Sequence, residues 1–385
     1  MIRFMATPTP IAPPAAPPAA HRFRDYFINM GPQHPSTHGV LRMIVKLAGE
    51  NVLGLTPHLG YVHRGIEKMG ESQTAIQFTH LTDRLDYLSA HMNNWGWTLA
   101  VEQALGIEVP ERAEYIRVLM SELTRVASHQ LWWGVFGMDL GALTQFLYAF
   151  RDREKINDIF EKTCGARLTM NYICPGGVTL DLEANFEQDT RAFVNYFRPI
   201  IEEYECLLSG NIIIQERTKG VGVLPADRAK SYGVTGPTLR ASGVDYDVRK
   251  NRPYGFYPKF NFKTAVAYEG DSWARYRVRL EEMRQSLKII EQALDQMPKS
   301  GPVRTKLPPT LKIPKGRYLS RVEAARGEIA FFLVGDDGPK PYRVKIRSPG
   351  FSNLSAFPEI IKGWRVADIV TVLSTFDIVV PDMDR

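Results

Sequence analysis

The feature that most constrains the fold is a series of long segments whose apolar residues repeat with the period of an α-helix. From about Thr79 to Val135, apolar residues recur at three- and four-residue steps, with an interruption near Gly106 to Pro110. Amphipathic stretches also run from Asp189 to Leu208 and from Trp273 to Met297. Because short loops join long segments, the chain is expected to fold around a helical bundle.

The glycines between residues 134 and 141 predict a break in the helices. Asp139 lies within this break, and another helix is expected to follow it to about Gly165. We therefore expect Asp139 to stand between two helices.

Both ends of the chain show the alternation of apolar and polar residues that is typical of strands. The strand-like segments are residues 25–29, 40–47 and 51–57 near the start, and residues 317–323, 328–334 and 342–346 near the end. The tail from Ile360 to Ser374 has helical spacing. The sequence therefore predicts an α+β fold, with a central long-helix bundle and small β elements from the N-terminal and C-terminal regions.

These patterns divide the chain into four regions. They are a proline- and alanine-rich leader at 1–22, expected to be disordered, an N-terminal β unit at 23–60, the helical bundle at 61–300, and C-terminal β hairpins with a terminal helix at 301–385. The bundle contains an irregular tract at 215–270, rich in glycine, tyrosine and arginine. A tract of this length without regular structure is usually functional or pinned by a partner.

Composition excludes several classes of protein. No apolar run is long enough to span a membrane, and the leader has neither the basic front nor the apolar core of a signal peptide. The net charge of +6 comes from scattered basic residues, so we predict no nucleic-acid partner. A basic face that docks on an acidic protein accounts for this charge equally well. The three cysteines form no Cys-x-x-Cys pair, which indicates a reducing compartment and no metal or cluster held by this chain alone.

Motifs for common enzyme chemistries are missing or incomplete. Gly220-Val221-Gly222 lacks the third glycine of a dinucleotide fingerprint, and neither a phosphate-binding Gly-x-x-x-x-Gly-Lys motif nor a Gly-x-Ser-x-Gly elbow occurs. His91 and His129 fall within helical patterns and are interpreted as hydrogen-bonded core or surface groups.

A stiff loop from Gly31 to Gly39 carries two histidines, His34 and His38, between Pro32 and the strand that follows. Such a loop can position a proton donor or a ligand. It can equally be a turn whose histidines bond its own backbone. A second polar segment, Asp83 to Ser89, is expected to be helical and to leave Tyr87 part-buried, with a hydroxyl that needs a partner.

The loop belongs to a longer pattern. The run from Gly31 to Arg42 resembles the N-terminal signature of the D-type subunit of proton-pumping NADH:quinone oxidoreductase, respiratory complex I, the homologue of the mitochondrial 49-kilodalton protein. Further matching motifs are His63-Arg64-Gly65 with Glu67-Lys68, Asp139-Leu140-Gly141-Ala142, Glu216-Arg217 leading to Gly220, Gly233 to Pro237, Leu239 to Asp245, Arg284 to Leu287, Ser348 to Phe351 and the terminal Asp384-Arg385. The match extends in order from about residue 25 to the end.

That family is similar in turn to the large subunit of nickel–iron hydrogenases, which holds its metals with two Cys-x-x-Cys pairs. Asp86 and Ser89 stand at the positions of the first pair, and Val379 and Asp382 at those of the second. None is a cysteine, so a thiolate site for nickel and iron is excluded.

The resemblance implies that the vacated cavity holds a quinone headgroup. Reducing a quinone takes two electrons and two protons, and its two carbonyl oxygens lie on opposite sides of the ring. By this resemblance His38 and Tyr87 donate protons at the two ends, and Asp139 pairs with His38. The residues implied to support the quinone site are His34, Gly39, Asp86 and Asp382.

The resemblance further implies that electrons come from an iron–sulfur cluster in a neighbouring subunit, close to Arg64 and Arg84. Many relatives have a histidine where this chain has Thr169, so the cluster is expected to have a low potential that depends little on pH. This favours menaquinone or plastoquinone over ubiquinone as substrate.

The implied partners are the cluster-bearing subunit of the B type, a subunit of the C type, other peripheral-arm subunits and a membrane-arm subunit of the H type at the quinone entrance. The implied location is peripheral, on the cytoplasmic side of a bacterial inner membrane. Two alternatives stay open: a relative fed by ferredoxin or coenzyme F420, and a non-catalytic scaffold between the two arms.

Overall fold

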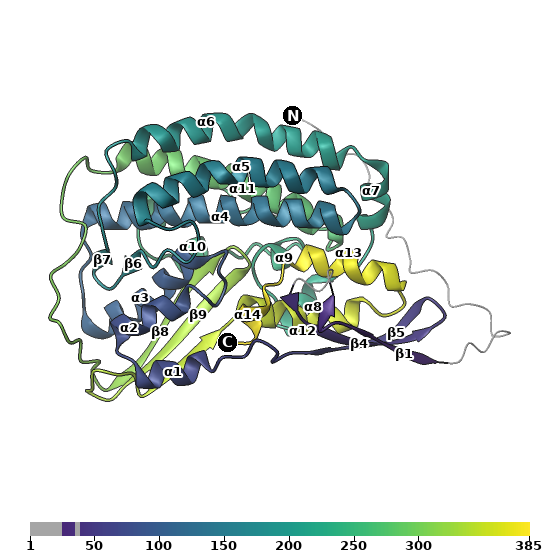
Figure 1. Ribbon diagram of the computed structural model, residues 1–385, viewed down its shortest axis with the longest axis horizontal. Coiled ribbons are helices and arrows are strands. Elements are labelled where there is room, and N and C mark those ends of the chain that lie inside the picture. The colour runs from purple at the N-terminus through teal and green to yellow at the C-terminus, as the bar shows by residue number, and fades with distance from the viewer. Residues whose placement is uncertain (1–24, 35–38) are drawn as a thin grey trace.

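The long helices form one layer of the molecule. The computed structural model describes residues 25–34 and 39–385. The layer consists of α4 (Glu111–Asp139), α5 (Leu143–Cys164), α6 (Phe186–Tyr204) and α11 (Ser272–Gln296), which Figure 1 shows side by side. Helix α4 is central, because it packs against both α5 and α11 and is buried along most of its length. The predicted bundle is confirmed.

Local sequence explains where these helices begin and end. Helix α3 (Ala90–Leu105) ends at Gly106, which adopts a left-handed conformation with φ of 62°. Helix α4 begins after Pro110, with Glu111 and Glu114 in its first turn beside the positive end of the helix dipole. The predicted interruption at this point is therefore confirmed. The Asp271 carboxylate caps α11 by accepting a hydrogen bond from the Ala274 N–H at 2.7 Å.

A three-stranded sheet lies on the other side of α3. Its strands β8 (Gly316–Ala324), β9 (Gly327–Gly335) and β10 (Arg343–Arg347) are antiparallel in the order β10-β9-β8. The backbone of α3 approaches this sheet closely, since a Cβ added at Gly96 would lie 2.8 Å from the Phe331 ring. Helix α1 (Ile66–Ser72) packs against β10 of this sheet, and helix α2 (Ala75–Thr82) packs against α3. The strand-like segments predicted at 317–323 and 328–334 therefore pair as a hairpin, with Arg326 in its turn.

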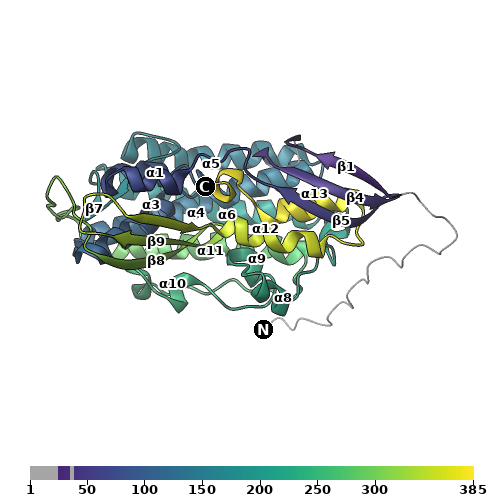
Figure 2. The same ribbon diagram turned by 90° about the horizontal axis from the view of Figure 1, so that it is seen from below.

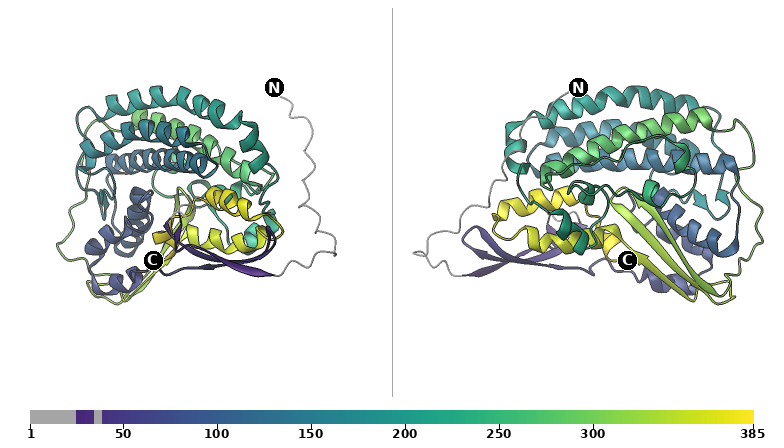
Figure 3. Two further views of the ribbon diagram at one scale, coloured as in Figure 1. Left: turned by 45° about the vertical axis from the view of Figure 1, so that its right-hand side comes forward. Right: turned by 180° about the vertical axis from the view of Figure 1, so that it is seen from behind.

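The two ends of the chain pack together. Strands β1 (Tyr26–Met30), β4 (Arg42–Ala48) and β5 (Asn51–His58) form a second antiparallel sheet. Its buried face packs against α12 (Pro349–Ile360), α13 (Val366–Phe376) and α14 (Val380–Met383). Figure 2 shows the purple strands beside the yellow helices, and backbone hydrogen bonds between Val52 and the 363–364 turn join them at 2.8 Å. The views in Figure 3 place both terminal units below the bundle.

The tract between α6 and α11 contains only short helices. They are a π-helical turn Glu205–Ser209, α7 (Ile212–Thr218), α8 (Ala226–Ser231), α9 (Gly236–Arg240), α10 (Val248–Asn251) and a 3₁₀ turn Tyr257–Lys259. Buried ion pairs fix this tract to the rest of the chain. Arg240 contacts Glu282 at 2.6 Å and Glu323 at 2.7 Å, and Arg249 contacts Glu122 at 3.1 Å. Contacts within the chain therefore pin much of the tract.

Two helix predictions were wrong. The expected break at 134–141 begins late, because α4 continues to Asp139 and the turn occupies only the residues before Leu143. Conversely, residues 83–89 are not helical and form successive turns between α2 and α3. Helix α12 was not anticipated, although Ser348 caps it in the usual way by accepting from the Phe351 N–H. In the described parts of the chain, no helix has the length and apolar character needed to cross a membrane.

Candidate functional site

The histidine loop lies partly outside the described residues. His38 falls in the undescribed segment 35–38, and His34 is described only as a backbone partner of Gly39 across the β2–β3 pair (Gln33–His34 and Gly39–Val40). Gly39 has φ of 125°, and a Cβ there would lie 3.1 Å from the Val380 side chain. The end of the loop therefore meets α14, two residues from Asp382, and this close approach favours glycine.

The turns at 83–89 separate the environments of two predicted site residues. The Asp86 side chain points inward and is 1% exposed, and its carboxylate accepts the Leu88 N–H at 3.1 Å. The Tyr87 side chain is 37% exposed and lies at the surface, so it is less buried than the sequence predicted. Burial raises the pKa of Tyr87; Arg326 opposes this effect, while Asp86 and Asp377 reinforce it. Tyr87 is thus an accessible phenol beside buried charges.

A buried arginine that the sequence did not single out organises these charges. Arg326, in the turn between β8 and β9, donates from Nη1 to Asp86 at 3.1 Å and to Ser128 at 2.6 Å. Its Nη2 donates to the Asp377 carboxylate at 2.9 Å, and its Nε donates to the Asp377 carbonyl at 3.1 Å. These four residues, here called the Arg326 cluster, join the 83–89 turns, α4, the β8–β9 hairpin and the end of α13. A charged residue in a hairpin turn is normally solvated, so the sequence held no signal for this role.

The C-terminal segment brings Asp382 to the same place. Asp382 is 1% exposed, and one carboxylate oxygen accepts from the Ser348 hydroxyl at 2.5 Å and the Gly350 N–H at 2.9 Å. Burial, followed by the nearby Asp86 charge, raises the pKa of Asp382 to about 6. Farther along, Asp384 accepts the N–H groups of Gly60 at 2.8 Å and Val62 at 3.0 Å, which anchors the tail.

Asp139 lies in the last turn of α4, not in a loop, and is half-buried. Its predicted pairing with His38 involves a residue outside the described segments. The structure therefore gives the position of Asp139 without testing that pair.

Arg64 lies beside the turns that contain Arg84, and the loop that contains Thr169 contacts the same turns. Both guanidinium groups are exposed, and Arg64 donates to the Arg84 carbonyl at 2.6 Å. The loop that contains Thr169 is tied to the same turns, because the Asn171 N–H donates to the Asp83 carboxylate at 2.8 Å. Asp83 is fully buried, and burial raises its pKa to about 7.

The two helical histidines are core groups, as interpreted from the sequence. His91 contacts the Thr124 hydroxyl at 2.7 Å, and burial lowers its pKa to about 3. His129 contacts Glu282 at 2.9 Å, and burial lowers its pKa as well. Within residues 25–34 and 39–385, no three histidine, cysteine, aspartate or glutamate side chains gather as a metal site would require.

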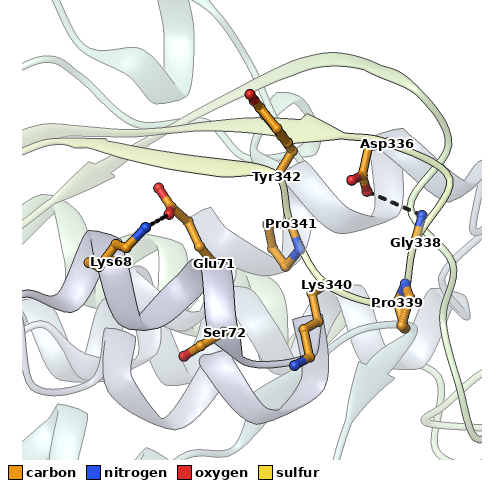
Figure 4. Close-up of a pocket in the computed structure, with 9 residues that line it drawn as sticks. All are labelled: Lys68, Glu71, Ser72, Asp336, Gly338, Pro339, Lys340, Pro341 and Tyr342. Atoms are coloured by element: carbon orange, nitrogen blue, oxygen red, sulfur yellow. Dashed lines mark hydrogen bonds and ion pairs between the residues drawn. The ribbon is translucent and has the colours of Figure 1, made fainter.

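A surface groove of about 440 Å³ lies between α1 and the loop joining β9 to β10 (Figure 4). Its lining residues are Lys68, Glu71, Ser72, Asp336, Gly338, Pro339, Lys340, Pro341 and Tyr342. Lys68 and Glu71 pair with each other at 2.5 Å, and Asp336 accepts the Gly338 N–H at 3.3 Å. None of the described site residues lines this groove, so it is separate from the Arg326 cluster.

Comparison with known proteins decides the family. The profile described as "Respiratory-chain NADH dehydrogenase, 49 Kd subunit" matches residues 139–311 and 306–385. The chain belongs to this family. It is therefore one subunit of a multi-subunit oxidoreductase, and the resemblance seen in the loop motifs is confirmed.

Bacterial relatives agree over nearly the whole chain. The D-type subunit of NADH-quinone oxidoreductase from Clostridium beijerinckii is 48% identical over 358 residues, which cover 93% of this chain and 96% of that protein. The D-type relative from Geobacter sulfurreducens is 47% identical, covering 93% and 98%. The C/D-type relative from Bacteroides fragilis is 51% identical over 362 residues, which cover 94% of this chain but 68% of that longer protein.

Proposed function

We propose that this chain is the quinone-site subunit of a proton-pumping NADH:quinone oxidoreductase and that it supplies protons for reduction of quinone to quinol. The proposal is carried by the convergence of Tyr87, Asp86, Asp382 and the end of the Gly31–Gly39 loop on the Arg326 cluster. These residues come from segments far apart in the sequence. An exposed phenol beside buried charges is suited to donate a proton to a ligand at the surface of this cluster.

The chemistry assigns separate roles to the two ends of the headgroup. Tyr87 donates a proton to one carbonyl oxygen of the quinone, and His38 donates to the other, with Asp139 orienting the imidazole. Asp86, Asp382, His34 and Gly39 shape the site around the ring. The two electrons come from an iron–sulfur cluster of the neighbouring subunit, so this chain needs no metal of its own.

Arg64, Arg84 and Thr169 form the face proposed to meet that cluster. Arg64 and Arg84 are both exposed, and the Arg64 guanidinium donates to the Arg84 carbonyl, so this face presents positive charge, which raises the reduction potential of a nearby cluster. Thr169 offers no group that titrates near neutral pH, so the potential is lower and depends less on pH than in relatives with a histidine at this position. On this basis the substrate is a low-potential quinone such as menaquinone or plastoquinone.

The proposed assembly follows from the same roles. The cluster-bearing neighbour is a subunit of the B type, and a subunit of the H type lies at the quinone entrance. A C-type neighbour and other peripheral-arm subunits make up the rest of the soluble part, on the cytoplasmic side of the inner membrane. The C/D name of the Bacteroides fragilis relative supports a C-type neighbour.

The test is quinone reduction by assembled complexes that carry Tyr87→Phe or His38→Ala, with Tyr342→Phe as the control. Tyr342 is 68% exposed and belongs to the separate groove, so its phenol should be dispensable. We expect each site variant to slow quinone reduction by about 100-fold, the scale of a lost general acid, while NADH oxidation by an artificial acceptor is unchanged. Normal quinone reduction by both site variants would overturn the proposal.

A further inference from the structure

The Asp382 carboxyl is a buried acidic group at the proposed quinone site, and its two oxygens are not equally hydrogen-bonded. It is 1% exposed, and one oxygen accepts two hydrogen bonds, from Ser348 and Gly350. The other oxygen, Oδ1, is buried and has no hydrogen-bond partner among the described residues. A buried carboxylate oxygen in this situation is costly, whereas a protonated one places an O–H there and removes the charge.

The charges around Asp382 do not compensate it. From the 83–89 turns it faces Asp86, a second carboxylate, and from the β8–β9 hairpin it faces Arg326. The hydrogen bonds that Arg326 donates within the described residues go to Asp86, Asp377, Ser89 and Ser128, and none goes to Asp382.

The remaining elements packed against Asp382 add dipoles, not a cation. Helix α12 contributes the Ser348 hydroxyl and the Gly350 N–H, and a Cβ at Gly350 would lie 2.7 Å from the carboxylate. On its own segment, Asp384 is bound to Gly60 and Val62, and Arg385 contacts Glu67 at 3.3 Å. The arginine that Asp382 faces, Arg326, is thus already hydrogen-bonded to two other acids, Asp86 and Asp377.

We propose that Asp382 stores an exchangeable proton on Oδ1 and returns it to Tyr87 after Tyr87 has protonated the quinone. This inference rests on the proposed function. Asp86 links the two groups, because it precedes Tyr87 in the chain and its charge acts on both Tyr87 and Asp382. The raised pKa of Asp382, about 6, agrees with a proton that is held near neutral pH yet can leave.

The proton balance of this step is simple. Two electrons from the neighbouring iron–sulfur cluster reduce the quinone, the Tyr87 O–H bond breaks, and its proton bonds to a quinone oxygen. The Asp382 O–H bond then breaks, and that proton converts the Tyr87 phenolate back to the phenol. Asp382 is left as a carboxylate and takes up a proton from water, while the second proton of the quinol comes from His38.

The decisive experiment compares Asp382→Asn with Asp336→Asn in the assembled complex. An asparagine oxygen can still accept from Ser348 and Gly350, whereas the exposed Asp336 accepts a hydrogen bond from the Gly338 N–H in a surface turn. We expect Asp382→Asn to lose at least about tenfold more in steady-state turnover than in the rate of its first quinone reduction, because turnover also requires the reloading of Tyr87. Asp336→Asn should match the unmodified complex in both measurements.

A spectroscopic readout separates proton storage from a structural role. In the redox-induced infrared difference spectrum, the unmodified complex should lose the carbonyl band of a protonated carboxylic acid upon quinone reduction, and Asp382→Asn should lack that band. Asp86→Asn removes the like charge, so the band should disappear at lower pH in the oxidised complex. If the Asp382→Asn complex fails to assemble, this pH shift in Asp86→Asn still tests proton storage at Asp382.

The outcomes distinguish this inference from the function on which it rests. If Tyr87→Phe slows quinone reduction but Asp382→Asn keeps normal turnover and the infrared band, proton storage at Asp382 is wrong and the quinone site stands. If Tyr87→Phe and His38→Ala also leave quinone reduction unchanged, the proposed function itself is wrong.

Discussion

Replacing the buried Asp83 by asparagine should stabilise the protein, and by more at higher pH. Asp83 is fully buried, its Oδ2 accepts the Asn171 N–H at 2.8 Å, and its Oδ1 has no hydrogen-bond partner among the described residues. Burial is the largest influence on this group, and it raises the pKa from 3.8 to about 7; the hydrogen bonds and Arg84 only reduce the shift.

The sign and size of the effect follow from linkage. Because the folded protein binds the Asp83 proton more tightly than the unfolded chain does, the stability from that proton is complete below about pH 4 and is lost as the pH rises to about 7. A shift of about three pKa units corresponds to about 4 kcal/mol, of which about 2 to 3 kcal/mol is lost between about pH 5 and about pH 8. Asparagine carries no charge at either pH and can still accept from Asn171.

The assay is urea unfolding of the full chain at those two pH values, for the unmodified protein, Asp83→Asn and Asp245→Asn. Asp245 is exposed, so its replacement should change stability little and equally at both pH values. The free-energy gain of Asp83→Asn over the unmodified chain should grow by about 2 to 3 kcal/mol from the lower to the higher pH. A gain that is independent of pH, or a loss at both values, would refute the reasoning.

Three further predictions concern the cluster, the backbone and the neighbouring redox centre. Arg326→Met leaves Asp86 and Asp377 buried without their cation and should lower the free energy of unfolding in urea by about 3–5 kcal/mol. Arg321→Met, at a part-exposed position of the same hairpin, should lower it by under about 1 kcal/mol. Equal losses would contradict the role given to Arg326. Gly236→Ala should destabilise the protein by about 1–3 kcal/mol more than Gly363→Ala. Both glycines have positive φ, but a Cβ at Gly236 would lie 2.4 Å from another backbone atom, whereas a Cβ at Gly363 would meet nothing within 4 Å. Similar decreases in melting temperature for the two variants would argue against this close approach. Potentiometric titration of the terminal iron–sulfur cluster in the assembled complex should show a low potential with a shallow pH slope, because Thr169 cannot titrate, and a steep slope would count against this assignment.

Most of the architecture could be predicted from local patterns. Leu41, Met43, Val45 and Leu47 recur at every second position and are all at most 2% exposed, and the last three lie on the inner face of β4. The glycine at 106 and the proline at 110 correctly marked the boundary between α3 and α4. Such signals are readable because each depends on residues that are neighbours in the chain.

The errors came from residues whose conformation is decided by distant contacts. The glycines at 134 and 137 suggested a break, yet α4 passes through them because they allow close packing: a Cβ at Gly134 would lie 2.7 Å from Ala149. The turns at 83–89 are held by the Arg326–Asp86 pair, whose partners are 240 residues apart. Neither the spacing of apolar residues nor secondary-structure propensity can predict a contact between residues so far apart in the chain.

The candidate site was predictable only in part, for the same reason. Tyr87, Asp86 and Asp382 were identified through family motifs, and the structure gathers them around a common centre. That centre, Arg326, was read as one residue of a hairpin turn, because its burial depends on Ser128 in α4 and Asp377 after α13. A buried cation with two acid partners could be found only after the chain was folded.

The most direct test of the proposed quinone site is a structure of the assembled complex with its quinone bound. We predict that one carbonyl oxygen of the headgroup lies within hydrogen-bond distance, about 3 Å, of the Tyr87 hydroxyl, with the ring beside the Arg326 cluster and the other carbonyl toward His38. A headgroup bound elsewhere, with Tyr87 facing only protein or water, would contradict the proposed function.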